Sequence, residues 1–393
     1  MPREPLALHS PDAGWLVTIG SDRDVVDRRL AGLGLVAPSA RTPEDVLRWM
    51  IAVQSQDIGP AKWSTAQRVH PAEAIREPAL DAALADGRIL RTHVLRPTWH
   101  FVLPDDIRWL VELTGPRIQV LSAFMHRTND LTESVRGRSN EVIERALEGG
   151  GSLTRAELRT QLDAAGFATD GFKIGYLMMH AEVTGLVCSG PPRGATQTYA
   201  LLADRAPNAR HLDREEGLAE LARRYFTSHG PATVKDFRTW SSLTAADARL
   251  GLEGAGPTLV RERYRDLEWW YGSGADTPVA ADRPTDPSPT VHLIQAYDEY
   301  LMGYLETRSV VDIDGAAGWV RTERAIYVAA VLLDGQFAGH WKRTITDTSV
   351  HIDVQWRLPF DAARAGALQA AADRHGAFLG VPATVTTTQL GAH

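Results

Sequence analysis

The most constraining feature of this 393-residue sequence is a set of helical segments followed by two short strands, an order that occurs three times. In the first occurrence, helical capping residues and apolar spacing are found in residues 24–33, 42–53, 61–69 and 79–86. Residues 88–95 and 98–102 then have the composition of strands, with a break at Arg96-Pro97. Helices followed by a two-stranded ribbon are typical of a winged helix.

The same order of elements recurs twice with different residues. A helical connection over residues 104–127 leads to the second set, and the third follows without a low-complexity linker. The elements expected in these two sets are residues 140–148, 152–158, 172–184, 187–188 and 198–201, and then 214–228, 233–237, 245–252 and a strand ending near 271. Three tandem winged-helix domains account for this repetition with one kind of unit.

The region after the proline-rich residues 282–289 changes to short strands. Asp334-Gly335 lies between two apolar runs, which is a hairpin signal, and residues 361–376 form an alanine-rich helical segment. The strands expected here are residues 292–294, 325–333, 337–342, 350–356 and 384–388. We therefore predict an α+β chain in which three winged helices precede a small β-barrel-like domain or sheet with one helix.

These patterns divide the chain into five parts, as its length allows. Residues 1–20 contain scattered Pro, Gly and Asp and are expected to form a flexible leader. The predicted domains are winged helix 1 at residues 21–115, winged helix 2 at 116–205, winged helix 3 at 206–288 and the β-barrel-like domain at 289–393.

Composition limits the classes of function. The sequence has 42 Lys and Arg against 49 Asp and Glu, a net charge of -7, which argues against nucleic-acid binding on all sides but not against one basic face. The single Cys188 excludes an intrachain disulfide and lies in an apolar run typical of a buried strand. No apolar run approaches the roughly 20 residues of a membrane span, and the first residues lack the apolar core of a signal peptide. We therefore expect a cytoplasmic protein without membrane contact.

The tripeptide Gln54-Ser55-Gln56 follows the apolar run of residues 46–53 and places two neutral amides beside a core. A buried amide without partners costs about 1 to 3 kcal/mol. On one helix the two Gln side chains would point about 160° apart, whereas positions i and i+2 of an extended segment share a face. We predict that the helix stops near Gln54, that the amides converge and that a new helix starts around Pro60. Converging amides can hold a water or polarise a substrate; a helix-capping pair is the alternative.

The third helices of the second and third units are poorly equipped to read DNA bases, because sequence-reading helices present Arg, Asn or Gln to base edges. The second unit offers Lys173, His180 and Glu182, and the third offers Arg249 beside acidic residues. We interpret these units as scaffold. In the first unit, basic and polar residues gather near the Gln pair, and a solvated basic face is the alternative; they are Lys62, Gln67, Arg68, Arg88, Arg91, Arg96 and His100.

Two blocks of the first unit carry a family resemblance. Ala52-Val53-Gln54-Ser55-Gln56 with Trp63, and then Arg91-Thr92-His93-Val94-Leu95-Arg96-Pro97-Thr98-Trp99-His100, resemble the YcaQ/AlkZ-like family of bacterial DNA glycosylases. Similar segments at 229–233, 296–301, 334–335 and 339–343 extend the resemblance over nearly the whole chain after residue 20. The family signature is Gln, an apolar residue and Gln in the AlkZ type, or Asp last in the YcaQ type. Gln54 and Gln56 match the AlkZ form, and Ser55 departs from the apolar middle position.

The resemblance implies tandem winged helices and a β-barrel arranged as a C-shape around double-stranded DNA. It implies hydrolysis of the N-glycosidic bond of N7-alkylated purines, including bases in interstrand crosslinks, in repair or in self-resistance to an alkylating natural product. We expect a monomeric, nucleoid-associated, monofunctional enzyme in which Gln54 and Gln56 are catalytic. The residues expected to contact DNA or the lesion are Lys62, Trp63, Arg91, Arg96, Thr98, His100, Lys342 and Arg343, the last two in a basic hairpin at 339–343.

Other interpretations of the sequence are possible. A non-catalytic winged-helix regulator would bind selected sequences as a dimer, and an enzyme of the same fold with another substrate, or a pseudoenzyme, also fits. We expect no metal or cofactor, because the 13 His residues show no paired spacing with Asp or Glu on one predicted helix face and no Gly-rich phosphate loop occurs. Asp298-Glu299 is interpreted as structural, because adjacent residues of a strand point to opposite faces.

Overall fold

The structure is a computed structural model that describes residues 18–274, 288–312 and 327–390. Most of the leader expected at residues 1–20 therefore lies outside the described residues, as do the first two residues of the strand expected at 325–333. Within the described residues, no helix is both long and apolar enough to cross a membrane.

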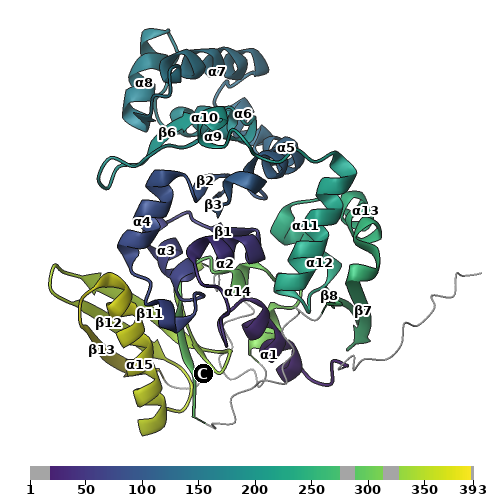
Figure 1. Ribbon diagram of the computed structural model, residues 1–393, viewed down its shortest axis with the longest axis vertical. Coiled ribbons are helices and arrows are strands. Elements are labelled where there is room, and N and C mark those ends of the chain that lie inside the picture. The colour runs from purple at the N-terminus through teal and green to yellow at the C-terminus, as the bar shows by residue number, and fades with distance from the viewer. Residues whose placement is uncertain (1–17, 275–287, 313–326, 391–393) are drawn as a thin grey trace, which may run out of the picture.

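The first group of elements occupies the middle of the molecule (Figure 1). A capping box between Thr42 and Asp45, with Pro43 in the first turn, starts its second helix. The three strands form an antiparallel sheet in the order β1-β3-β2. Its first strand was not anticipated from the sequence. The elements are α1 (Asp22–Gly32), α2 (Pro43–Met50), β1 (Ala52–Gln54), α3 (Ile58–Ala66), η1 (Pro71–Glu73), α4 (Glu77–Asp86), β2 (Leu90–His93) and β3 (Trp99–Val102).

The second group lies at one end of the molecule, at the top of Figure 1. Its three strands pair in the order β4-β6-β5. Cys188 is fully buried in β5, as expected, and burial raises the pKa of its thiol to about 12. The elements are α5 (Pro104–Leu121), α6 (Ala123–Thr128), α7 (Glu133–Leu147), β4 (Leu153–Thr154), α8 (Arg155–Ala164), α9 (Lys173–Val183), β5 (Val187–Ser189), β6 (Thr198–Leu201) and α10 (Leu202–Arg205).

The third group is helical with one two-stranded sheet, and it lies on the right of Figure 1. Its first helix begins with a capping box between Asp213 and Glu216. The elements are α11 (Arg214–His229), α12 (Val234–Ser241), α13 (Ala245–Ala255), η2 (Gly256–Thr258), β7 (Leu259–Tyr264) and β8 (Leu267–Gly272).

The C-terminal strands form an open five-stranded sheet in the order β13-β12-β11-β10-β9, so the expected barrel closure is wrong for the described residues. β12 and β13 are parallel, which requires the crossover helix α15 between them and leaves β13 at an edge. The hairpin at Asp334-Gly335 is confirmed, with φ of 50° and 77°. The elements are β9 (Val291–Ile294), α14 (Glu299–Met302), η4 (Arg308–Val311), β10 (Ala330–Leu333), β11 (Gln336–Ile345), β12 (Val350–Trp356), α15 (Ala362–Leu379) and β13 (Ala383–Gln389).

The largest apolar core joins parts of the chain that are far apart in sequence. It contains Val53 of β1, Trp240 of α12 and Tyr300 of α14. A second core packs Trp63 of α3 against the C-terminal sheet, including Trp356. The strand that carries Gln54 is therefore buried where the first, third and C-terminal groups meet.

Candidate active site

The segment Gln54-Ser55-Gln56 begins in strand β1, which runs beside β3, and bends at Gln56. α2 ends at Met50 and not near Gln54 as predicted, because Ile51 has a left-handed backbone with φ of 73°, which a β-branched residue rarely adopts. The first residue of the segment pairs with His100, and its middle amide donates to the Trp99 carbonyl at 2.7 Å. The new helix close to residue 60 is confirmed, and the extended conformation is found at Gln54 but not at Gln56, which lies in a bend.

The amide of Gln54 is buried and fixed in orientation. The residue is 2% exposed, and Arg96 Nη2 donates a hydrogen bond to its Oε1 at 2.8 Å. Because a guanidinium has no acceptor, the side-chain atom that faces Arg96 must be the oxygen. The amino group of Gln54 is the end of the amide that does not face Arg96.

His100 is a neutral imidazole that contacts the same Arg96 guanidinium. Its Nε2 lies 3.1 Å from Arg96 Nη2, and its Nδ1 lies 3.0 Å from the Thr98 carbonyl oxygen. Since Arg96 only donates and a carbonyl only accepts, the ring hydrogen is on Nδ1. Burial, and then the charge of Arg96, lowers the pKa of His100 to about 3. His100 and Arg96 are 0% and 8% exposed and directed at the protein interior, so their contact with DNA stays a prediction.

The lowered pKa of His100 predicts a pH dependence of stability. The unfolded chain binds this proton near pH 6.5 but the folded chain only near pH 3, so folding loses stability as the pH falls between these values. Between pH 7.5 and 5.5 the loss from this group is about 1 kcal/mol. His100→Gln should therefore lose about 1 kcal/mol less than wild type over this interval in urea unfolding. Equal losses in the two proteins would contradict the neutral buried imidazole.

Gln56 lies at the surface, unlike Gln54. Its Oε1 is 3.5 Å from the Trp99 amide nitrogen, and its carbonyl is 3.4 Å from Arg91 Nη2. The same guanidinium bonds the Ser55 carbonyl at 3.0 Å and lies 4.4 Å from the centre of the Trp99 ring. Arg91 thus holds the backbone of the motif. The two Gln side chains have different partners here, and their convergence on one substrate stays a prediction.

Ser55 occupies a position suited to an apolar residue. Its side chain is fully buried, and its hydroxyl is without a hydrogen-bond partner among the described residues. Ser55, which departs from the family signature, therefore has its side chain in the core and away from solvent.

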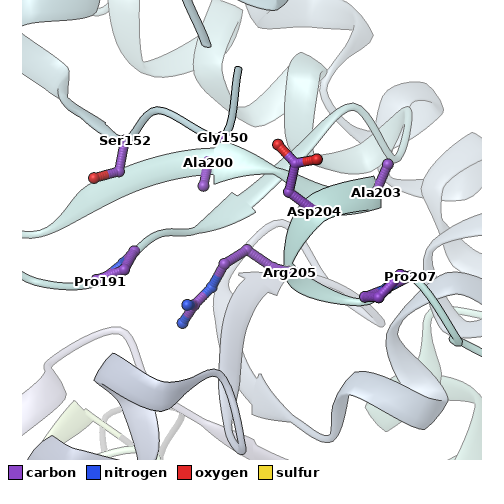
Figure 2. Close-up of a pocket in the computed structure, with 8 residues that line it drawn as sticks. All are labelled: Gly150, Ser152, Pro191, Ala200, Ala203, Asp204, Arg205 and Pro207. Carbon is purple, nitrogen blue, oxygen red and sulfur yellow. The ribbon is translucent and has the colours of Figure 1, made fainter. Parts of the chain in front are cut away.

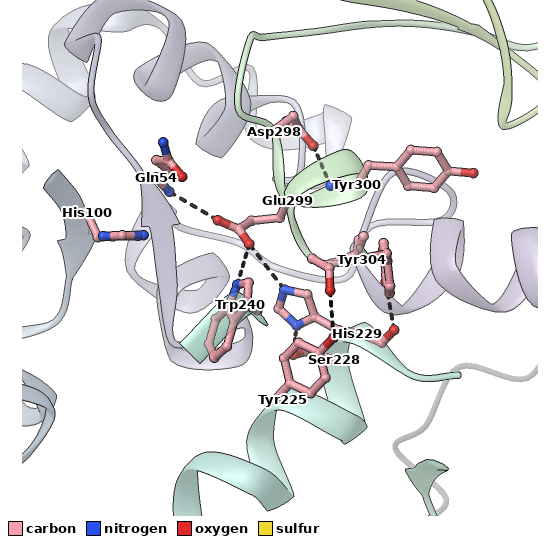
Figure 3. A network of polar contacts seen from close by, with 12 residues as sticks. Gln54, His100, Tyr225, Ser228, His229, Trp240, Asp298, Glu299, Tyr300 and Tyr304 are labelled. Carbon is pink, nitrogen blue, oxygen red and sulfur yellow. Dashed lines mark hydrogen bonds and ion pairs between the residues drawn. The ribbon is translucent and has the colours of Figure 1, made fainter. Parts of the chain in front are cut away.

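Glu299 was missed as a site residue and lies at the centre of the polar network in Figure 3. Its Oε1 accepts from the Gln54 main-chain amide at 3.2 Å, and its Oε2 accepts from Trp240 Nε1 at 2.7 Å. His229 Nε2 lies 3.5 Å from Oε2. Although burial opposes ionisation, His229 and Arg96 lower the pKa of Glu299 to about 2.

Asp298 and Glu299 lie at the start of a helix and not on the expected strand, but their side chains diverge as expected. Asp298 is the N-cap of the short helix α14, so the two carboxylates diverge into different buried contacts. Asp298 pairs with Arg68 at 2.6 Å. The family segment 296–301 was the one sequence signal for Glu299.

The remaining predicted contacts lie on α3, between β2 and β3, and on β11. Lys62 is paired with Glu77 and Asp81. Trp63 is 4% exposed, donates to the Leu293 carbonyl at 2.7 Å, and packs on the C-terminal sheet. Its burial indicates a structural role.

Thr98 is partly buried, and its hydroxyl has no partner among the described residues. Lys342 is exposed, whereas Arg343 Nη1 lies 3.2 Å from His375 Nε2. Both are in the middle of β11 and not at a hairpin tip, because the β11–β12 turn comes later. The structure therefore brings Arg96, Thr98 and His100 together with Gln54. Arg343 reaches from β11 to the segment after the motif, where its Nη2 lies 3.2 Å from the position that a Cβ on Gly59 would take.

Two cavities lie in other parts of the protein. One of about 560 Å³ is lined by small residues and Arg205 of the second group (Figure 2). One of about 1160 Å³ lies between α1, the end of α3 and α15. Neither is lined by Gln54 or Gln56, so the candidate site is defined by its polar network.

This oriented Gln54 amide, next to the exposed Gln56 in a mixed α and β fold, has the features expected of a DNA glycosylase. The family described as DNA glycosylase AlkZ-like matches residues 47–378, and the chain belongs to it, which confirms the resemblance. Among solved structures, Streptomyces sahachiroi DNA glycosylase AlkZ is 22% identical, with a TM-score of 0.75, over 93% of this chain and 99% of that chain. The latter likeness shows a shared fold. No curated protein matches the chain.

Proposed function

We propose that this protein is a monofunctional glycosylase that hydrolyses the N-glycosidic bond of N7-alkylated purines in double-stranded DNA, with Gln54 and Gln56 as catalytic residues. The supporting observation is the buried amide of Gln54, fixed by Arg96 and followed by the exposed Gln56, in a chain of the AlkZ-like family. Crosslinked purines belong to the same chemical class. Repair and self-resistance to an alkylating natural product are the contexts in which this activity is useful.

The chemistry of an N7-alkylated purine matches two neutral amides. Such a base is cationic, so it departs as a neutral molecule without an acid to protonate it. Water attacks C1′ of the deoxyribose, the bond from C1′ to N9 breaks with its electron pair moving to the base, and a water proton passes to solvent. The amides position the water and stabilise the developing oxocarbenium ion through their dipoles. Neither is a strong base, which restricts the enzyme to activated lesions.

We further propose that the three groups of helices and small sheets are winged-helix units which, with the C-terminal sheet, form a C-shape around duplex DNA. The exposed Lys342 is proposed to contact phosphate, and Arg91, which is bonded to the Ser55 and Gln56 carbonyls, is proposed to do so at the edge of the motif. Because the polar network is completed within one chain, the enzyme is proposed to act as a monomer.

The test is release of 7-methylguanine from a methylated duplex by purified protein. We expect 7-methylguanine and abasic sites to appear in proportion to the enzyme, with no release from the unmethylated duplex or from one carrying uracil, a neutral base. A regulator would instead bind undamaged DNA of selected sequence and release nothing. Binding without base release from the methylated duplex would overturn the proposal.

A further inference from the structure

Two buried opposite charges contact Gln54 at different atoms. Arg96 bonds the side-chain oxygen at 2.8 Å, and Glu299 accepts from the main-chain amide at 3.2 Å. Both also bond Trp240, Arg96 at the carbonyl and Glu299 at the indole nitrogen. The two charges do not form a direct ion pair, since no oxygen of Glu299 lies within 4.0 Å of the Arg96 guanidinium among the described contacts. Each is held separately in the interior.

An ion pair and two histidines that lie close to Arg96 and Glu299 add little net charge to them. Arg68 is paired with Asp298 at 2.6 Å, and both side chains are almost fully buried. His100 is neutral, and burial also lowers the pKa of His229 below its usual value. Burial lowers the pKa of Arg96, and Glu299 is the carboxylate whose charge opposes this effect and favours the ionised form of Arg96.

This balance matters for a cationic substrate. The guanidinium of Arg96 is fixed next to the Gln54 amide, so an uncompensated positive charge would repel an alkylated purine and the oxocarbenium ion that follows. In a water-poor interior such repulsion is felt over several ångströms. A neutral residue in place of Arg96 would remove the repulsion but also the hydrogen bond that fixes the Gln54 amide. A nearby carboxylate removes the repulsion and leaves the hydrogen bond intact.

We infer that Glu299 is a positioning residue that cancels the charge of Arg96 and holds the main chain of Gln54, so that the site accepts a cationic lesion and transition state. The inference rests on the proposed function and extends it to a residue 245 positions along the chain from Gln54. Glu299 acts through Gln54 and Arg96 and makes no contact with the reacting atoms. Its contribution is to electrostatic selectivity for a cation.

The test compares two abasic-site analogues in the same duplex, a cationic pyrrolidine and a neutral tetrahydrofuran. In Glu299→Gln, which keeps an oxygen acceptor but removes the charge, we expect the affinity for the pyrrolidine duplex to fall about 10-fold or more. The affinity for the tetrahydrofuran duplex should stay within about two-fold. Single-turnover release of 7-methylguanine at saturating enzyme should slow by a similar factor. An unchanged ratio of the two affinities would overturn the inference.

Two further variants separate charge from structure. Trp240→Phe removes a hydrogen bond to Glu299 without changing charge, and it should retain the preference for the pyrrolidine duplex; loss of the preference there would count against a charge effect. Arg96→Met combined with Glu299→Gln restores neutrality and should recover the preference, even if Glu299→Gln alone is too unstable to assay. Failure of wild type to release 7-methylguanine would instead reject the proposed function, whatever the affinity ratio.

Discussion

Gln54→Ala should release 7-methylguanine at least about 100-fold more slowly than wild type in single-turnover assays. The reason is geometric: the Gln54 amide is 2% exposed and fixed by Arg96, so its dipole is oriented before substrate arrives. Alanine removes that dipole and leaves one N–H of Arg96 Nη2 without its acceptor, while the contact with His100 remains. Gln56→Ala should also slow release, by about 10-fold, because the exposed Gln56 is held less tightly.

Gln67→Ala is the matched control for this prediction. Gln67 follows α3 and faces the 1160 Å³ cavity between α1 and α15, away from the network around Gln54. Its replacement should leave the rate of base release within about two-fold of wild type. Wild-type rates in Gln54→Ala, with the circular dichroism of the folded protein, would reject Gln54 as a catalytic residue.

Arg68→Met should lower the free energy of unfolding by about 3–5 kcal/mol. The Arg68 guanidinium bonds both oxygens of Asp298 and also Ser64, and the side chains of the pair are 1% and 0% exposed. Methionine fills a similar volume but leaves the Asp298 carboxylate buried without its counter-charge. Chemical denaturation followed by circular dichroism measures this loss.

Arg41→Met is the control, because Arg41 is paired with Glu73 at 2.9 Å but is 78% exposed. An exposed pair is worth about 0–1 kcal/mol, so this variant should remain close to wild type. If Arg68→Met and Arg41→Met lose the same stability, the buried pair does not join α3 to the C-terminal part in the way the contacts indicate.

The fold was predictable where the signals are local. The Asp334-Gly335 turn and the strands around it follow from turn chemistry and the apolar runs on both sides, and both are found. The open C-terminal sheet was not predictable, because it depends on the parallel pairing of β12 with β13 across α15, which leaves β13 at an edge. The end of α2 was also missed: no propensity rule places a β-branched Ile51 at φ of 73°.

The site was predictable in part for the same reason. Gln54, Arg96 and His100 are neighbours in one unit, and their residue types and spacing in the sequence indicate a common site. Glu299 was dismissed because its role comes from partners on α12 and β1, which only tertiary packing supplies. Trp63 was assigned to DNA because sequence does not show that its indole is directed at the C-terminal sheet.

The hydrogen bond between Gln54 and Glu299 also limits which fragments of the chain can keep this site intact. β1 is held by a carboxylate 245 residues away, on a helix that in turn contacts Trp240. A fragment ending after the first group of elements would keep both glutamines and still lack their support. Truncation after the first group would remove both the carboxylate that holds β1 and the indole that holds this carboxylate.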